Sequence, residues 1–130
     1  METKQNLEGL QVLIVEDEYL LAEEVCDLVK EMGAAAVGPF SNAAAALEFL
    51  LQGPQPDIAV LDIDLQGRPA FPVAEVLLAR TVPFLFVTGF GGGAIPPKYR
   101  NTIRIQKPYS LETLRAGLLN LARAEPLPQT

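Results

Sequence analysis

Short hydrophobic segments recur at five places along the chain, separated by longer stretches in which polar residues are mixed in. They occupy residues 12–15, 34–37, 58–61, 84–87 and 103–106. Most of these segments are rich in β-branched or aromatic residues and do not alternate with polar ones, which is typical of strands that are covered on both faces. The pattern therefore predicts five short strands in a mostly parallel sheet.

Two of the intervening stretches carry hydrophobic stripes with helical spacing. The first stripe consists of Leu21, Val25, Leu28 and Met32, and the second of Leu111, Leu114, Leu118 and Leu121. Spacings of three and four positions place each stripe on one face of a helix. Gly33 is the expected end of the first helix, and Ser110 is the expected start of the last one.

The middle of the chain holds two further helical segments and one segment that disfavours a helix. Residues 43–51 have high helix propensity, with Ser41 as the expected N-cap, and another helix is expected over residues 73–80. Residues 89–101 are rich in glycine and proline, which predicts a mobile loop with at most a short turn near residues 97–100. Strands that alternate with helices in this way predict an α/β fold.

The size and composition limit the domain organisation and the partners. A chain of 130 residues suits one domain, expected over residues 10–124, between an N-terminal extension at 1–9 and a flexible tail at 125–130. A net charge of −6 without a basic run argues against a surface for nucleic acid or anionic membranes. No segment resembles a signal peptide or a membrane span, and the single Cys26 cannot form an internal disulfide. We therefore expect a cytoplasmic protein.

The chain contains no histidine. This excludes catalysis by Ser-His-Asp and Cys-His arrangements, zinc held by histidine, and a phosphohistidine on this chain. Carboxylates, hydroxyls and lysines are the groups that remain for chemistry.

Groups of these kinds follow the predicted strands. Glu16 and Asp17 come directly after the first strand, Asp62 after the third, Thr88 after the fourth and Lys107 after the fifth. Because sites in open parallel sheets form beyond the carboxyl ends of strands, these side chains are expected to converge if the sheet is doubly wound. Carboxylates that lie close together require a hard cation such as Mg²⁺. A metal-bound carboxylate beside a fixed ammonium group can act as a nucleophile toward a phosphoryl group.

Four segments carry a resemblance to a known family. VLIVEDE, PDIAVLDIDLQG, PFLFVTGF and QKPYS resemble, in order and spacing, the signature segments of response-regulator receiver domains. The resemblance covers residues 12–122, nearly the whole chain. It implies a flavodoxin-like fold with a doubly wound five-stranded parallel sheet of strand order 2-1-3-4-5, in which the fourth helix is short or replaced by the glycine-rich loop.

The resemblance also implies a role for each residue of the site. The phosphoacceptor would be Asp62, the switch hydroxyl Thr88 and the phosphate-binding residue Lys107, which precedes a cis bond to Pro108. The implied ligands of Mg²⁺ are Glu16, Asp17, Asp62 and the backbone carbonyl of Asp64.

A receiver domain of this kind takes its phosphoryl group from a sensor histidine kinase or a phosphotransfer protein. We expect a stand-alone receiver that acts through a downstream protein or as a phosphate sink, and that catalyses at most its own phosphorylation and dephosphorylation. No nucleic-acid or membrane partner is expected, and the protein is expected to be a monomer or a weak dimer.

The chain departs from the family pattern at three positions. The segment FVTGF resembles the Phe-Ala-Thr-Gly-hydrophobic-Tyr motif of a subgroup of single-domain receivers, but Val87 replaces the alanine and Gly91 stands in the place of the tyrosine. Arg104 occupies the position of the usual aromatic switch residue, three positions before Lys107. The usual coupling between the threonine and an aromatic ring therefore cannot operate in its ordinary form.

Two other functions remain open. The chain could be a binding module that keeps the receiver fold without using phosphorylation. Asp62-Ile63-Asp64 also resembles the nucleophile and general acid of haloacid-dehalogenase-type phosphatases, although that family places the pair on an early strand of a larger domain. Taken singly, the acidic residues after the first strand could also simply begin a helix, where carboxylates favour the positive end of the dipole.

Overall fold

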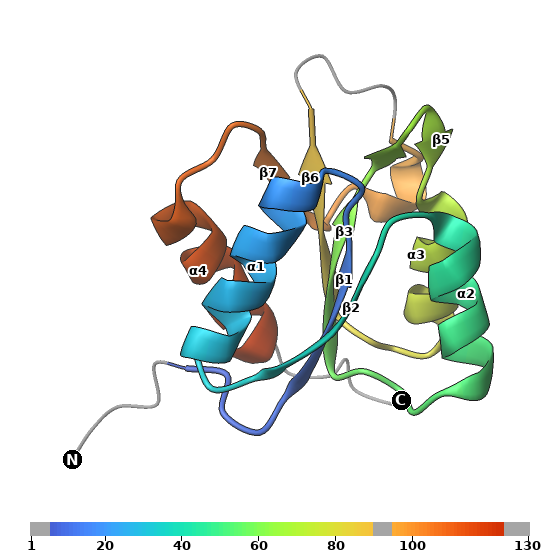
Figure 1. The fold of residues 1–130 in the computed structure, drawn as a ribbon. Helices are drawn as coiled ribbons and strands as arrows, with labels where there is room; N and C mark the ends of the chain where they lie inside the picture. Colours follow the sequence, from blue (N-terminus) through green and yellow to red (C-terminus); the bar gives the residue numbers. More distant parts are fainter. Residues whose placement is uncertain (1–5, 90–94, 124–130) are drawn as a thin grey trace.

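The computed structural model describes residues 6–89 and 95–123. Its main sheet has five parallel strands in the order β2-β1-β3-β6-β7 (Figure 1). They are β1 (Gln11–Val15), β2 (Ala35–Phe40), β3 (Ile58–Asp62), β6 (Phe84–Thr88) and β7 (Ile103–Gln106). Counting only the strands of this sheet, the order is the predicted 2-1-3-4-5, and the α/β fold class is confirmed.

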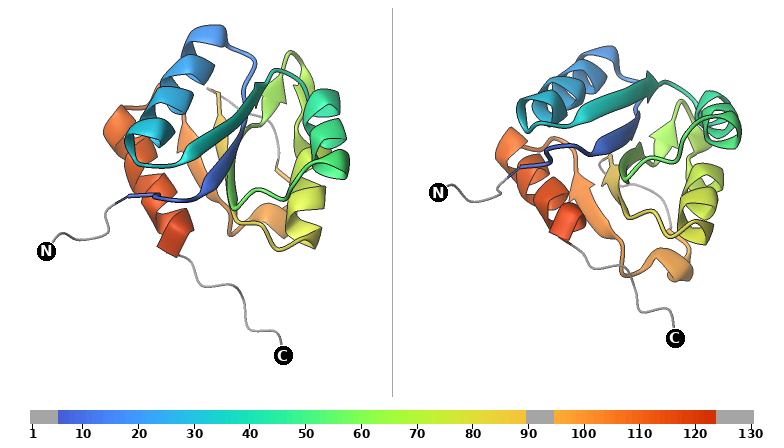
Figure 2. Two further views of the ribbon diagram at one scale, coloured as in Figure 1. Left: turned by 60° about the horizontal axis from the view of Figure 1, so that its bottom comes forward. Right: turned by 90° about the horizontal axis from the view of Figure 1, so that it is seen from below.

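Within the described residues, four α-helices cover the sheet, two on each face. They are α1 (Tyr19–Glu31), α2 (Ala43–Gln52), α3 (Phe71–Ala79) and α4 (Leu111–Arg123). The pair α1 and α4 lies on one face and the pair α2 and α3 on the other, as the end-on view shows (Figure 2). None of the described helices is long and apolar enough to span a membrane.

The strands show why their sequences lack alternation. Val12 and Ile14 point to the α1/α4 face, whereas Leu13 and Val15 point to the α2/α3 face, and all four are fully buried. Both faces of the sheet are hydrophobic interior, so successive side chains must be apolar although they point in opposite directions.

Helix α4 packs closely against the sheet at Gly117. A Cβ atom at this position would lie 2.9 Å from Cδ1 of Ile105, so glycine permits the close approach. Three of the four predicted leucines of α4 are buried, but Leu111 is exposed, because it lies at the first residue of the helix. The predicted stripe is therefore right for the body of the helix and wrong for its first turn.

The segment after Asp62 forms a small hairpin. It consists of β4 (Asp64–Leu65) paired with β5 (Arg68–Pro69). Gln66 and Gly67 join them with φ values of 55° and 83°, the positive pair that type I′ turns require. The sequence did not predict this turn because Gln-Gly is not the usual Asn-Gly or Asp-Gly signal.

Three local predictions need correction or limits. Helix α2 is capped by Asn42, not Ser41, because the Asn42 side chain accepts a hydrogen bond from the Ala45 N–H at 2.8 Å. Helix α3 begins at Phe71, two residues earlier than predicted. Between β6 and β7 the described residues contain only the short 3₁₀ helix η1 (Pro97–Tyr99), in agreement with the predicted turn, and residues 90–94 lie outside the described ones.

Candidate functional site

The predicted site residues gather at the carboxyl edge of the sheet, the upper edge in Figure 1. Glu16 follows β1, Asp62 ends β3, Thr88 ends β6 and Lys107 follows β7. These four strands are consecutive neighbours in the sheet. Parallel pairing therefore brings together residues that are far apart in the sequence.

Three carboxylates form the centre of the site. Oxygen atoms of Glu16, Asp17 and Asp62 lie within 4.8 Å of one another. Glu16 and Asp62 are buried, with exposed fractions of 4% and 2%, whereas Asp17 is half-buried. Burial, and after it the charge of Glu16, raises the pKa of Asp62 to about 7. Such a cluster of hard oxygen donors, open on the side of Asp17, fits Mg²⁺, which prefers oxygen ligands and retains waters.

Lys107 binds the carboxylate cluster through its ammonium group. Its Nζ donates to Asp62 Oδ2 at 3.1 Å, to Glu16 Oε2 at 3.2 Å and to Glu18 Oε2 at 2.9 Å. Burial alone would lower the pKa of Lys107, but the hydrogen bonds to Glu18 and Asp62 raise it above its ordinary value. The ammonium group is therefore charged at neutral pH and uses its three N–H donors on three carboxylates.

The backbone at the end of β1 holds Glu16 in place. The N–H of Glu16 donates to the carbonyl of Phe40 at 2.9 Å, after a register shift between β1 and β2. Gly38 lies at this shift with φ of 108°, and a Cβ atom there would be 2.9 Å from the carbonyl oxygen of Ile14. The Glu16 carboxylate also accepts from the N–H of Glu18 at 3.0 Å, which fixes the side chain from its own segment.

The second oxygen of Asp62 is held by the backbone of the hairpin. Asp62 Oδ1 accepts from the Asp64 N–H at 3.1 Å. The side chain of Asp64 is exposed and accepts from the Gly67 N–H at 2.9 Å, so it stabilises the turn. Asp64 pairs with Pro69 one position away from Ile63, whose carbonyl accepts from the Ala70 N–H at 2.9 Å, so Asp64 and Pro69 form a pair without cross-strand hydrogen bonds. The Asp64 carbonyl is therefore free of a cross-strand hydrogen bond and can serve as a metal ligand.

Thr88 lies between the strands that carry Asp62 and Lys107. The N–H of Lys107 donates to the Thr88 carbonyl at 2.7 Å, and the Lys107–Pro108 bond is cis, as the resemblance implies. Val87, beside Thr88, pairs with Asp62 across the β3–β6 ladder. The main chain thus places Thr88 at the rim of the carboxylate cluster, half-buried.

Glu18 is a site residue that the sequence did not single out. It follows Glu16 and Asp17 in the segment VLIVEDE, and the structure joins it to Lys107, 89 positions away. The contact depends on the direction of an exposed side chain, and no local pattern encodes it. Tyr109 was also missed; its buried hydroxyl has no hydrogen-bond partner among the described residues, and burial, followed by the charge of Glu16, raises its pKa to about 12.

Arg104 and Tyr99 both lie on the α2/α3 face of the sheet. Ile103 and Ile105 point to the α1/α4 face, so Arg104 points to the other face, where it is exposed. The aromatic group on that face comes from η1 instead: Tyr99 is buried and makes an edge contact with Phe86 at 5.4 Å between ring centroids.

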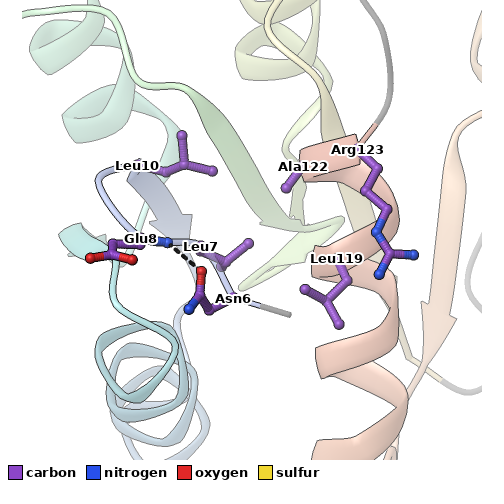
Figure 3. Close-up of a pocket in the computed structure, with 7 residues that line it drawn as sticks. All are labelled: Asn6, Leu7, Glu8, Leu10, Leu119, Ala122 and Arg123. Atoms are coloured by element: carbon purple, nitrogen blue, oxygen red, sulfur yellow. Dashed lines mark hydrogen bonds between the residues drawn. The ribbon is translucent and has the colours of Figure 1, made fainter. Parts of the chain in front are cut away.

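A separate hollow of about 510 Å³ lies beside the start of β1 and the end of α4 (Figure 3). Its lining residues are Asn6, Leu7, Glu8, Leu10, Leu119, Ala122 and Arg123. The Glu8 N–H donates to Asn6 Oδ1 at 3.2 Å across one side of it. This hollow is remote from the carboxyl edge of the sheet and shares no residue with the carboxylate cluster.

Known proteins resemble the chain in both sequence and fold. No family model matches it. The solution structure of SdrG from Sphingomonas melonis Fr1 is 35% identical, with a TM-score of 0.76, over 86% of this chain and 95% of that one. The REC domain of the response regulator PhyR from Erythrobacter litoralis is 26% identical, with a TM-score of 0.80, over 95% and 97% of the two chains.

A curated relative extends this similarity to a longer protein. The transcriptional regulatory protein PdtaR of Mycobacterium tuberculosis is 27% identical over 108 residues, which are 80% of this chain and 52% of PdtaR. The chain therefore spans about half the length of this relative. Together with the order of the five strands, these similarities show that the chain belongs to the receiver-domain family of response regulators.

Proposed function

We propose that the protein is a phosphorylatable receiver in which Asp62 accepts a phosphoryl group from a phosphohistidine. The observation that carries this proposal is the state of the Asp62 carboxylate. One oxygen accepts from Lys107 Nζ and the other from the Asp64 N–H, each at 3.1 Å, inside a buried cluster of acids. These contacts fix the carboxylate in one orientation, which positions it as a nucleophile.

The reaction forms a bond between an Asp62 oxygen and phosphorus and breaks the phosphorus–nitrogen bond of the donor. The donor imidazole takes the electron pair of the broken bond. Glu16, Asp17, Asp62 and the Asp64 carbonyl would hold Mg²⁺. When bound, this ion would neutralise the charge that develops on the phosphoryl oxygens. Lys107 would donate to one of these oxygens, and Thr88 would donate its hydroxyl to another.

The donor in this proposal is a sensor histidine kinase or a phosphotransfer protein. The phosphorylated domain, over residues 10–124, then acts on a downstream protein or serves as a phosphate sink. The segment FVTGF supports a place in the Phe-Ala-Thr-Gly-hydrophobic-Tyr subgroup, although Val87 and Gly91 depart from its motif. The protein catalyses only its own phosphorylation and dephosphorylation in this scheme, and we propose that it is a monomer or a weak dimer.

A second candidate function is a binding module that does not use phosphorylation. It is favoured by Arg104, which is exposed where receivers place an aromatic switch residue. The phosphatase alternative has less support. A general acid must reach the leaving group, but the Asp64 carboxylate is occupied with the Gly67 N–H in the hairpin turn.

Intact mass measurement distinguishes these functions. Wild-type protein incubated with acetyl phosphate and Mg²⁺ is expected to gain one phosphoryl group, and Asp62→Asn is expected to gain none. Absence of an adduct on the wild type with acetyl phosphate and with a phosphohistidine donor would favour the binding module. An adduct of equal yield on Asp62→Asn would place the acceptor elsewhere.

A further inference from the structure

All three N–H donors of Lys107 are used within the described residues, which limits how the lysine can bind a phosphoryl group. An ammonium group has three N–H donors, and those of Lys107 go to Glu16, Glu18 and Asp62. No donor is left for a further acceptor. One of these three hydrogen bonds must therefore give way when the lysine donates to a phosphoryl oxygen.

The three carboxylates differ in how easily they can leave. The side chains of Glu16 and Asp62 have exposed fractions of 4% and 3%, so neither can turn into solvent. The side chain of Glu18 is 59% exposed, although its bond to Lys107, at 2.9 Å, is the shortest of the three. Water can replace Lys107 as the partner of Glu18 at little cost, because the carboxylate is already largely hydrated.

Glu18 has no other structural task for its side chain. It is the N-cap residue of α1, but its side chain makes no capping hydrogen bond. Its carbonyl accepts from the Ala22 N–H at 2.8 Å, a bond that any residue at this position can make. The carboxylate of Glu18 is therefore committed to Lys107 alone among the described residues.

We propose that Glu18 is a positioning residue that competes with the phosphoryl group for Lys107. This inference rests on the proposed function of Asp62. Phosphorylation removes the negative charge of the Asp62 carboxylate and places phosphoryl oxygens beside Lys107, while the negative charge of Glu18 remains next to them. Glu18 thereby disfavours the phosphorylated state in two ways: it occupies a donor of Lys107, and it repels the phosphoryl oxygens.

Beryllofluoride, which mimics a phosphoryl group on a carboxylate, tests the competition as a binding equilibrium. The ¹⁹F NMR signal of bound beryllofluoride, titrated in the presence of Mg²⁺, gives its affinity for each variant. Glu18→Gln is expected to bind it about two- to fivefold more tightly than the wild type, the range expected for a largely exposed ion pair. Glu23→Gln is the matched control, because it removes the same charge from an exposed position of α1.

Two further readouts separate competition from a structural effect. The gain of Glu18→Gln is expected to shrink as the salt concentration rises, because screening weakens the contribution of an exposed charge. Glu18→Asp keeps the charge and is expected to bind more weakly than Glu18→Gln. Phosphorylation by acetyl phosphate, followed by intact mass, is expected to rank the variants in the same order.

The outcomes distinguish this inference from the proposed function. Wild-type protein that takes up neither beryllofluoride nor a phosphoryl group overturns both. Normal uptake by the wild type, with equal affinities for Glu18→Gln and Glu23→Gln, overturns only the competition by Glu18. An equal gain in both variants also overturns it, because that result assigns the effect to net charge.

Discussion

Lys107 Nζ lies 3.1 Å from Asp62 Oδ2, although 45 positions separate the two residues in the sequence. The contact exists because β3, β6 and β7 are neighbours in a parallel sheet, so their carboxyl ends meet at one edge. Lys107 opposes the rise in the Asp62 pKa that burial and Glu16 produce, yet that pKa still lies near 7. The protonation and the stability of the site therefore change within the physiological range of pH.

The stability of the metal-free protein is expected to fall as the pH rises toward 8. Asp62 has a higher pKa folded, about 7, than unfolded, about 4, so it binds its proton more tightly when folded. The stabilisation is thus present below about pH 4 and is lost as the pH passes through about 7. A pKa shift of this size contributes at most about 4 kcal/mol to the free energy of unfolding. Asp62→Asn removes the contribution.

Urea unfolding of both proteins in EDTA, from pH 4.5 to pH 8, measures this difference. The free energy of unfolding of the wild type should fall more steeply with pH than that of Asp62→Asn. Added Mg²⁺ should restore stability to the wild type at pH 8, because a bound cation compensates the buried charges. Parallel pH profiles for the two proteins would show that folding does not raise the pKa of Asp62.

Removal of the Lys107 charge is expected to destabilise the metal-free protein at pH 8. Lys107→Met leaves the buried carboxylates of Glu16 and Asp62 without a cation, a change that typically costs about 3 kcal/mol. Lys98→Met is the matched control, because Lys98 also forms an ion pair at 2.9 Å, with Glu75, but both side chains are exposed. Chemical unfolding should show a clear loss for the first variant and no measurable loss for the second. Similar losses in both would contradict the importance of burial.

The strands, and the meeting of the site residues at the strand ends, could be predicted from the sequence for a physical reason. A strand buried on both faces needs an unbroken apolar run, and the residue that ends the run lies at the edge of the sheet. The positions of Glu16, Asp62 and Lys107 follow from this rule and from the parallel topology. Their roles in phosphoryl transfer stay predictions.

Other features were not accessible because they depend on contacts between distant segments or on unusual local conformations. The bond between Glu18 and Lys107 depends on where an exposed side chain turns. The hairpin needs a positive φ at Gln66, which glutamine rarely adopts without a tertiary cause. The cap of α2 is Asn42 although Ser41 is an equally good capping residue, so propensity alone could not choose between neighbours.

The hydroxyl of Tyr99 is not expected to stabilise the fold. It is buried without a hydrogen-bond partner among the described residues, whereas the ring stacks on Phe71 at 5.7 Å between centroids. Tyr99→Phe keeps the ring and removes the unsatisfied group, so the protein should be as stable or up to about 1 kcal/mol more stable. Tyr99→Ala should lose about 3 to 5 kcal/mol through the cavity it leaves.

Thermal and urea unfolding of the two variants check this prediction. A loss of more than about 1 kcal/mol in Tyr99→Phe would show that the hydroxyl has a partner, such as an ordered water.

The same unfolding measurements test the role of Arg104. If Tyr99 supplies the aromatic packing beside Phe86, Arg104→Ala should leave stability unchanged, because its side chain is exposed.

Gly38 is expected to be required both for the end of the β1–β2 pairing and for the position of Glu16. Gly38→Ala forces a side chain into φ of 108° and places its Cβ 2.9 Å from the Ile14 carbonyl. Gly67→Ala is the matched control, because φ is also positive there, at 83°, but the space around it is open. Strain alone should cost the Gly67 variant about 1 kcal/mol, and crowding should bring the Gly38 variant to about 2 kcal/mol or more.

A second measurement connects this backbone position to the site. The Gly38 substitution displaces the segment that ends at Phe40, whose carbonyl accepts from the Glu16 N–H. Calorimetric titration should therefore show weaker Mg²⁺ binding in Gly38→Ala than in Gly67→Ala. Equal stability and equal Mg²⁺ affinity in the two variants would mean that the backbone at the β1–β2 register shift relaxes without moving Glu16. In that case the hydrogen bond from the Glu18 N–H would be the contact that orients the carboxylate.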